Sequence, residues 1–132
     1  MRAAHRLLIV DDEPNVLLTL GMIFELDGYK VSRASSCAEA LKLLNDGACY
    51  EAVITDLNME RQDIGLDVAR AALRLRPRPV VVICTGYADL GNTRAALDMH
   101  VDHFATKPVD LDELKLAIRR LTQRNAFLKI AG

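Results

Sequence analysis

The feature of this sequence that most constrains the fold is an alternation of short apolar runs with longer stretches of helical period. The apolar runs at 6–11, 52–56 and 79–85 are nearly continuous and rich in β-branched residues, which is typical of strands buried on both faces. Two further runs, at 29–34 and 102–106, are predicted to be edge strands. The chain therefore offers five strands.

The stretches between these runs have the spacing of amphipathic helices. In the first, Pro14 suits the first turn and Gly28 lies beyond the end. The second starts at Ser36, where Glu39 can complete a capping box. Further helices are expected around 64–75, around 89–99 and from Asp110 onward.

Strands and helices that alternate in this way predict an α/β domain, with a parallel sheet covered by helices on both faces. The 132 residues suit one domain with one sizeable core, and no repeat, linker or low-complexity segment divides them. In such sheets the binding crevice lies beyond the carboxyl ends of the strands. The residues at those ends are therefore the candidates for function.

Polar side chains end or follow four of the expected strands. Asp11 and Asp12 end the first strand, Asp56 the third and Thr85 the fourth, and Lys107 comes just after the fifth. Because the carboxyl ends of parallel strands share one edge of the sheet, these side chains are expected in one crevice. Each alone is commonly a helix cap or a turn residue, whereas the combination is specific.

Three carboxylates in one crevice repel one another, and burial adds to the cost of their charge. A cation relieves both, and an oxygen-rich cluster open to water suits Mg²⁺. With the lysine ammonium on the opposite side, the crevice suits a dianionic phosphoryl group, to which the threonine hydroxyl can donate a hydrogen bond. Asp56 is then the natural nucleophile, because carboxylates can form aspartyl phosphates.

Four stretches of the sequence resemble the receiver domains of two-component response regulators. They read LLIVDDEP, AVITDLNM, VVVICTGYAD and DHFATKPVDLDEL, and the similarity extends to about residue 121. The resemblance implies a flavodoxin-like (βα)₅ fold with strand order 2-1-3-4-5. The whole chain, 1–132, is accordingly expected to form a single receiver domain.

The resemblance also implies a role for each residue of the crevice. Asp56 is the expected phosphoacceptor, and Lys107 is expected to contact the phosphoryl oxygens. The metal, Mg²⁺ with Mn²⁺ as an alternative, is expected on Asp12 directly, on Asp11 through water, on Asp56, and on the backbone carbonyl of Asn58.

Two residues form the switch that the resemblance implies. Thr85 follows the phosphoryl group, and Phe104 turns into the space that Thr85 vacates. The sequence alone leaves open that Phe104 simply packs and never rotates. The Lys107–Pro108 peptide bond is expected to be cis, a form that is much less costly before proline than elsewhere.

The implied function is signalling rather than enzymatic turnover. A sensor histidine kinase or a phosphotransfer protein would phosphorylate Asp56 in a Mg²⁺-dependent reaction. The surface of the fourth helix, fifth strand and fifth helix would then control a partner or output domain. Beyond this, only self-phosphorylation from small phosphodonors and autodephosphorylation are expected. A homodimer through the same surface, or through the C-terminal helix, is a further expectation.

One loop departs from the family pattern. Glu60 stands where most members have proline, and Gly65 lies nine residues after Asp56 where eight is usual. The loop at 60–65 is therefore one residue longer. Its negative charge can alter the access of a phosphodonor, or the loop is merely longer and solvated; the sequence leaves both open.

The C-terminal segment 122–132 extends past the usual end of a receiver. Either it begins a helix that leads toward an output domain and can pair in a dimer, or it is a frayed tail. A stripe of heptad spacing runs into it, with asparagine at an a-type position. The stripe consists of Leu111, Leu114, Ile118, Leu121, Asn125 and Leu128.

The composition of the chain bears on its expected cellular location and on the partners it is expected to bind. Cys37, Cys49 and Cys84 are odd in number and lack C-x-x-C spacing, which favours reduced thiols in a cytoplasmic protein. No apolar run is long enough to span a membrane. A net charge of −1 gives no case for direct nucleic-acid binding.

Three other readings compete with the signalling switch. A haloacid-dehalogenase phosphatase also uses an aspartate nucleophile and Mg²⁺, but it needs D-x-D after its first strand, where this chain has DDEP. A flavodoxin needs a phosphate loop rich in Ser, Thr and Gly after that strand. A degenerate receiver, used only as a scaffold, would not need the complete set of site residues.

Overall fold

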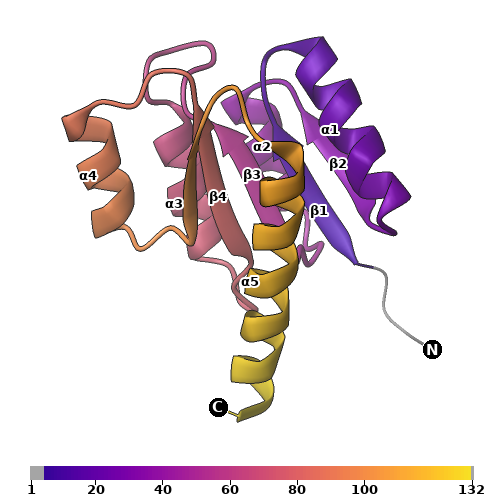
Figure 1. Cartoon of the computed structure of the whole chain (residues 1–132). Helices are drawn as coiled ribbons and strands as arrows, with labels where there is room; N and C mark the ends of the chain where they lie inside the picture. The colour runs from indigo at the N-terminus through magenta and orange to yellow at the C-terminus, as the bar shows by residue number, and fades with distance from the viewer. Residues whose placement is uncertain (1–4, 132) are drawn as a thin grey trace.

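The computed structural model describes residues 5–131, which form strands and helices in strict alternation (Figure 1). The strands are β1 (Arg6–Val10), β2 (Lys30–Ala34), β3 (Ala52–Asp56), β4 (Val80–Thr85) and β5 (His103–Thr106). The helices are α1 (Pro14–Leu26), α2 (Cys37–Leu44), α3 (Gly65–Leu73), α4 (Leu90–Asp98) and α5 (Leu111–Ala131). Every expected strand and helix is present, and the observed ends differ from the expected ones by a few residues.

The five strands form one parallel sheet in the order β2-β1-β3-β4-β5, so the predicted flavodoxin-like fold is confirmed. The two strands predicted at the edges, β2 and β5, lie there. In the centre, Ile54 of β3 lies in register with Ile9 of β1 and Val82 of β4. Since all strands are parallel, their carboxyl ends lie along one edge of the sheet.

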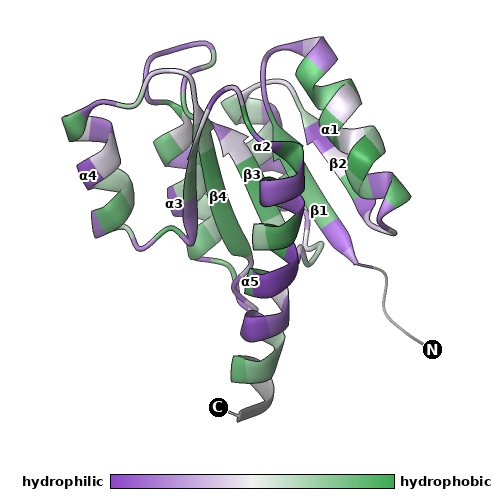
Figure 2. Ribbon diagram, in the orientation of Figure 1, coloured by the Kyte–Doolittle hydropathy of each residue, from purple (hydrophilic) through white to green (hydrophobic). Residues whose placement is uncertain are grey.

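Helices cover both faces of the sheet and bury its central strands, which Figure 2 shows as strongly hydrophobic. On one face, Phe24 of α1 and Leu114 and Ile118 of α5 pack against side chains of β1, β3 and β4. On the other face, α2, α3 and α4 pack against the alternate side chains of the same strands. The strands are buried on both faces because each face has its own helical layer.

The helix starts show capping in part as predicted. The Ser36 hydroxyl accepts a hydrogen bond from the Glu39 backbone N–H at 3.1 Å, but the Glu39 carboxylate accepts from the Ser35 hydroxyl instead of completing a capping box. At α5, the Asp110 carboxylate accepts a hydrogen bond from the Glu113 backbone N–H at 3.1 Å.

The α5 helix continues without a break to Ala131, so residues 122–131 are helical; Gly132 lies outside the described residues. Along the predicted heptad stripe, Leu114 and Ile118 are buried in the domain. The Asn125 carboxamide donates a hydrogen bond to the Arg78 backbone oxygen at 2.8 Å, between α3 and β4. Asn125 therefore contacts the body of the domain. None of the helices in residues 5–131 combines the length and apolar character that crossing a membrane requires.

Candidate functional site

The sheet edge brings together three aspartates from two strands. Asp11 and Asp12 follow β1, and Asp56 is the last residue of β3. One carboxylate oxygen of each lies within 4.8 Å of those of the other two. Asp11 and Asp56 are buried, whereas Asp12 is exposed. The cluster is therefore both charged and reachable from solvent.

Lys107 reaches this cluster from the connection between β5 and α5. Its Nζ lies 3.0 Å from Asp11 Oδ2 and 3.4 Å from Asp56 Oδ2. The Lys107–Pro108 bond at this point is cis, as the resemblance implied. One ammonium group thus bridges two of the three carboxylates.

The electrostatics of Asp56 and Lys107 are linked. Burial raises the pKa of the Asp56 carboxyl and the nearby Asp11 charge raises it further, while Lys107 partly offsets both effects. Burial alone would lower the pKa of the Lys107 ammonium, but its contacts with Asp11 and Asp56 outweigh burial and raise it. The site therefore favours the charged form of Lys107 and disfavours the charged form of Asp56.

Thr85 ends β4 and is fully buried beside this cluster. Its hydroxyl oxygen accepts a hydrogen bond from the Tyr87 backbone N–H at 2.9 Å. Its backbone oxygen accepts from the Lys107 backbone N–H at 2.7 Å. Thr85 thus connects the loop before α4 with the segment that carries the lysine.

Phe104 lies on the edge strand β5, paired in register with Ile83. It is partly buried and packs against the hydrophobic cluster on the side of α2, α3 and α4. Its rotation on phosphorylation stays a prediction.

The longer loop after β3 folds back onto the domain. The Asn58 side-chain oxygen accepts a hydrogen bond from the Asp63 backbone N–H at 2.7 Å, and Asp63 has a φ of 60°, in the left-handed region. Both carboxylate oxygens of Glu60 lie 3.2 Å from the Cys37 backbone nitrogen, at the first residue of α2. Glu60 is exposed and also caps a neighbouring helix, and the effect of the loop's charge on phosphodonor access stays a prediction.

Gly65 begins α3 directly against the end of β3. A Cβ atom at this position would lie 2.0 Å from the Asp56 backbone oxygen and 2.7 Å from the Leu57 Cα. No side chain fits in that space. The glycine displaced by one position in the sequence therefore serves a close contact with the backbone of the candidate phosphoacceptor.

Sequence reasoning missed Asn92, which is buried in the first turn of α4. Asn92 and Asp89 form a capping box, and the Asn92 amide also donates to the Tyr87 backbone oxygen at 2.9 Å. A longer contact of 3.5 Å joins the same amide to the Asp63 carboxylate. The spacing of Asp89 and Asn92 was the available signal.

Comparison with known proteins bears on the family and the fold of this chain. The model of the response regulator receiver domain family matches residues 7–119. The chain is 37% identical over 125 residues to the transcriptional regulatory protein GlrR of Escherichia coli and 33% identical over 129 residues to its regulatory protein AtoC. These alignments cover 95% and 98% of this chain but only 28% of each relative.

Solved structures show the same fold. A CheY-like receiver domain protein from Methanospirillum hungatei superposes with a TM-score of 0.87 at 27% identity, covering 94% of this chain and 98% of that one. A response regulator from Burkholderia pseudomallei, solved with a phosphorylated aspartic acid, a calcium ion and citrate, superposes with a TM-score of 0.79 at 25% identity. That alignment covers 95% of this chain and 72% of the other. The chain belongs to the family of response regulator receiver domains.

Proposed function

We propose that this chain is a phosphorylation switch in which Asp56 accepts a phosphoryl group from a sensor histidine kinase or a phosphotransfer protein. The observation that carries the proposal is the position of the Asp56 carboxylate. It lies in a cluster with two further carboxylates, and an ammonium group lies 3.4 Å away. With a divalent cation bound by the carboxylates, this arrangement can neutralise the charge of a transferring phosphoryl group.

The residues at the site fit a divalent cation, because three carboxylate oxygens converge and one of their residues is exposed. Asp12 would hold the metal directly and Asp11 through water, together with Asp56 and the backbone carbonyl of Asn58. Mg²⁺ is the expected ion, with Mn²⁺ as an alternative, and when bound it would supply charge neutralisation for the phosphoryl oxygens. The calcium ion in the Burkholderia relative supports a divalent metal in this family.

The chemical step forms one bond and breaks another. A carboxylate oxygen of Asp56 attacks the phosphorus of a phosphohistidine, the P–N bond breaks, and its electron pair stays on the departing imidazole. Lys107 stays beside the reacting carboxylate as a positive charge. Hydrolysis of the aspartyl phosphate by water later returns the carboxylate and releases inorganic phosphate.

The new group brings roughly −1.5 to −2 charge to the site at neutral pH. The Thr85 hydroxyl then turns toward it and leaves its bond to the Tyr87 N–H. Phe104 moves toward the vacated space, and the α4–β5–α5 surface changes. Phosphorylation in this way shifts a two-state equilibrium through contacts made in only one of the states.

The changed surface is proposed to act on an output domain or a downstream protein, or on a second copy of the chain. The chain covers only 28% of the transcriptional regulators that it resembles, so an output domain would lie outside this sequence. We expect this activity in the cytoplasm, where the thiols of Cys37, Cys49 and Cys84 would stay reduced.

Intact mass after incubation with acetyl phosphate and Mg²⁺ tests the proposal. We expect a gain of one phosphoryl group that is absent in Asp56→Asn and kept in Asp98→Asn, a change of an exposed aspartate on α4. A protein that forms no adduct, or that turns over many phosphomonoesters, contradicts the proposed switch.

A further inference from the structure

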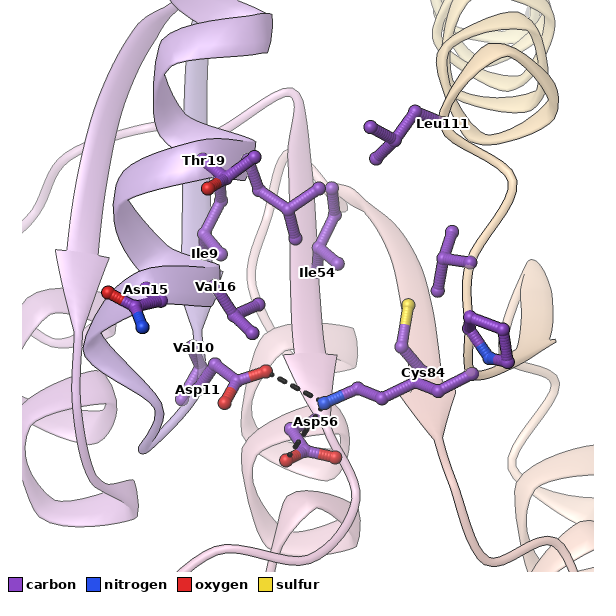
Figure 3. A pocket seen from close by; sticks show the side chains of 14 residues that line it. Ile9, Val10, Asp11, Asn15, Val16, Thr19, Ile54, Asp56, Cys84 and Leu111 are labelled. Atoms are coloured by element: carbon purple, nitrogen blue, oxygen red, sulfur yellow. Dashed lines mark hydrogen bonds and ion pairs between the residues drawn. The ribbon is translucent and has the colours of Figure 1, made fainter.

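A cavity of about 350 Å³ opens beside the phosphoacceptor, between α1, the central strands and the start of α5 (Figure 3). At one end it reaches Asp11, Asp56 and Lys107. The rest of its wall is mostly apolar and includes Ile9, Val16, Leu20, Ile54, Cys84 and Val109.

Phosphoryl transfer uses only the polar end of this cavity. The apolar walls contribute nothing to binding a phosphoryl group or a metal ion, both of which need oxygen and nitrogen ligands. Burial raises the pKa of the Cys84 thiol to about 12, so this wall also stays uncharged. A concave apolar cavity of this volume with a few convergent polar groups is the usual form of a site for a small organic ligand.

The charge at the polar end selects the ligand. Asp11 and Asp56 face the cavity with one ammonium, that of Lys107, and Asp12 adds a third carboxylate nearby. The carboxylates outnumber the cation. A cationic group on the ligand therefore complements this end, whereas a carboxylate would meet mostly like charge.

We propose that the cavity binds small amphipathic amines, with the apolar body between α1 and α5 and the ammonium group at Asp11 and Asp56. Such a ligand competes with the divalent metal for the same carboxylates and so opposes phosphorylation. Binding itself needs no phosphoryl transfer, so this proposal can stand or fall separately from the proposed function.

Amide chemical shifts of the ¹⁵N-labelled protein, without divalent metal, measure binding of phenethylamine as the probe. We expect saturable shifts at Val16, Thr19 and Leu111, which line the cavity, and none at Leu97 on α4. The carboxylate of matching shape, 3-phenylpropionate, is expected to cause no saturable shift at these residues. Equal binding of both probes, or shifts spread over the whole surface, would overturn the proposal.

Two substitutions on neighbouring positions of α1 locate the ligand. Thr19 is exposed at the cavity wall, whereas Leu18 is 57% exposed and does not line it. Thr19→Trp is expected to weaken phenethylamine binding about tenfold by filling the cavity, and Leu18→Trp to leave it within about twofold. Unchanged binding in Thr19→Trp, or equal weakening in both folded variants, counts against the cavity as the site.

Competition tests the position of the ammonium group. With Mg²⁺ at about nine times its own Kd, the apparent Kd of phenethylamine is expected to rise about tenfold by mass action. An apparent Kd that ignores Mg²⁺ would overturn the placement at Asp11 and Asp56. This measurement also needs no phosphorylated protein, so a failed phosphorylation assay would not affect it.

Discussion

Asp56 is a functional side chain whose burial lowers the stability of the domain. Burial holds its pKa above the ordinary value, and Lys107 only partly offsets this. A carboxyl whose pKa is raised by folding favours the folded state below its unfolded pKa, and this contribution is lost as the pH rises through the folded pKa. At neutral pH the Asp56 charge therefore opposes folding.

Replacing Asp56 by Asn should stabilise the metal-free domain at neutral pH by about 1 kcal/mol, since the amide removes the buried charge. The gain in stability should shrink as the pH falls toward about 3.9, the pKa of an unfolded aspartate, because the Asp56 carboxyl of the wild type is then protonated and as neutral as the amide. Urea unfolding with EDTA across this range measures the difference. A gain that does not depend on pH would show that charge burial is not its cause.

Gly65 is the second residue whose role follows from a single contact. Gly65→Ala places a methyl group 2.0 Å from the Asp56 backbone oxygen, and this should cost about 3 kcal/mol in the free energy of unfolding because backbone must move. The control is Gly91→Ala in α4, where the nearest atom, Asp89 Oδ1, is 3.4 Å away. There alanine should stabilise the helix by up to about 1 kcal/mol. Equal urea unfolding midpoints for the Gly65→Ala and Gly91→Ala variants would refute the close contact at Gly65.

Among the secondary-structure elements, strands were the most predictable. Continuous apolar runs such as 79–85 identify buried parallel strands, and the strand ends then located Asp11, Asp56 and Lys107 at one edge. The direction of Glu60 was not predictable, because it depends on α2 lying beside the loop after β3. The same holds for Asn125, whose partner, the Arg78 backbone oxygen, comes from a loop 47 residues earlier.

The contact between Glu60 and α2 predicts a measurable effect on that helix. Glu60→Ala removes a carboxylate from the Cys37 N–H at a helix N-terminus and should cost about 1 kcal/mol of stability. Arg61→Ala serves as the control, because its side chain is 71% exposed and its nearest carboxylate contact is 3.9 Å long. Its effect should stay within about 0.5 kcal/mol. The urea midpoints of the two variants should differ; identical values would show that Glu60 is solvated instead.

For the domain as a whole, metal binding should appear as stability, because the proposed ligands come from separate segments that meet only in the fold. Mg²⁺ at about 100 times its Kd should add about 2.7 kcal/mol and raise the thermal midpoint. Asp12→Asn should lose most of this increase, and Asp98→Asn should keep it. A rise of equal size in Asp12→Asn would place the metal elsewhere.

The unbroken length of α5 has a mechanical consequence. A helix from Leu111 to Ala131 is about 30 Å long at ~1.5 Å per residue, and it starts four residues after Lys107. If α5 moves as a rigid rod, a tilt of about 10° about its N-terminal end displaces its C-terminal end by about 5 Å. The hydrogen bond from the Asn125 side chain to the Arg78 backbone oxygen would oppose that displacement. Removing this hydrogen bond would allow a larger displacement of the C-terminal end of α5, and strengthening it would allow a smaller one.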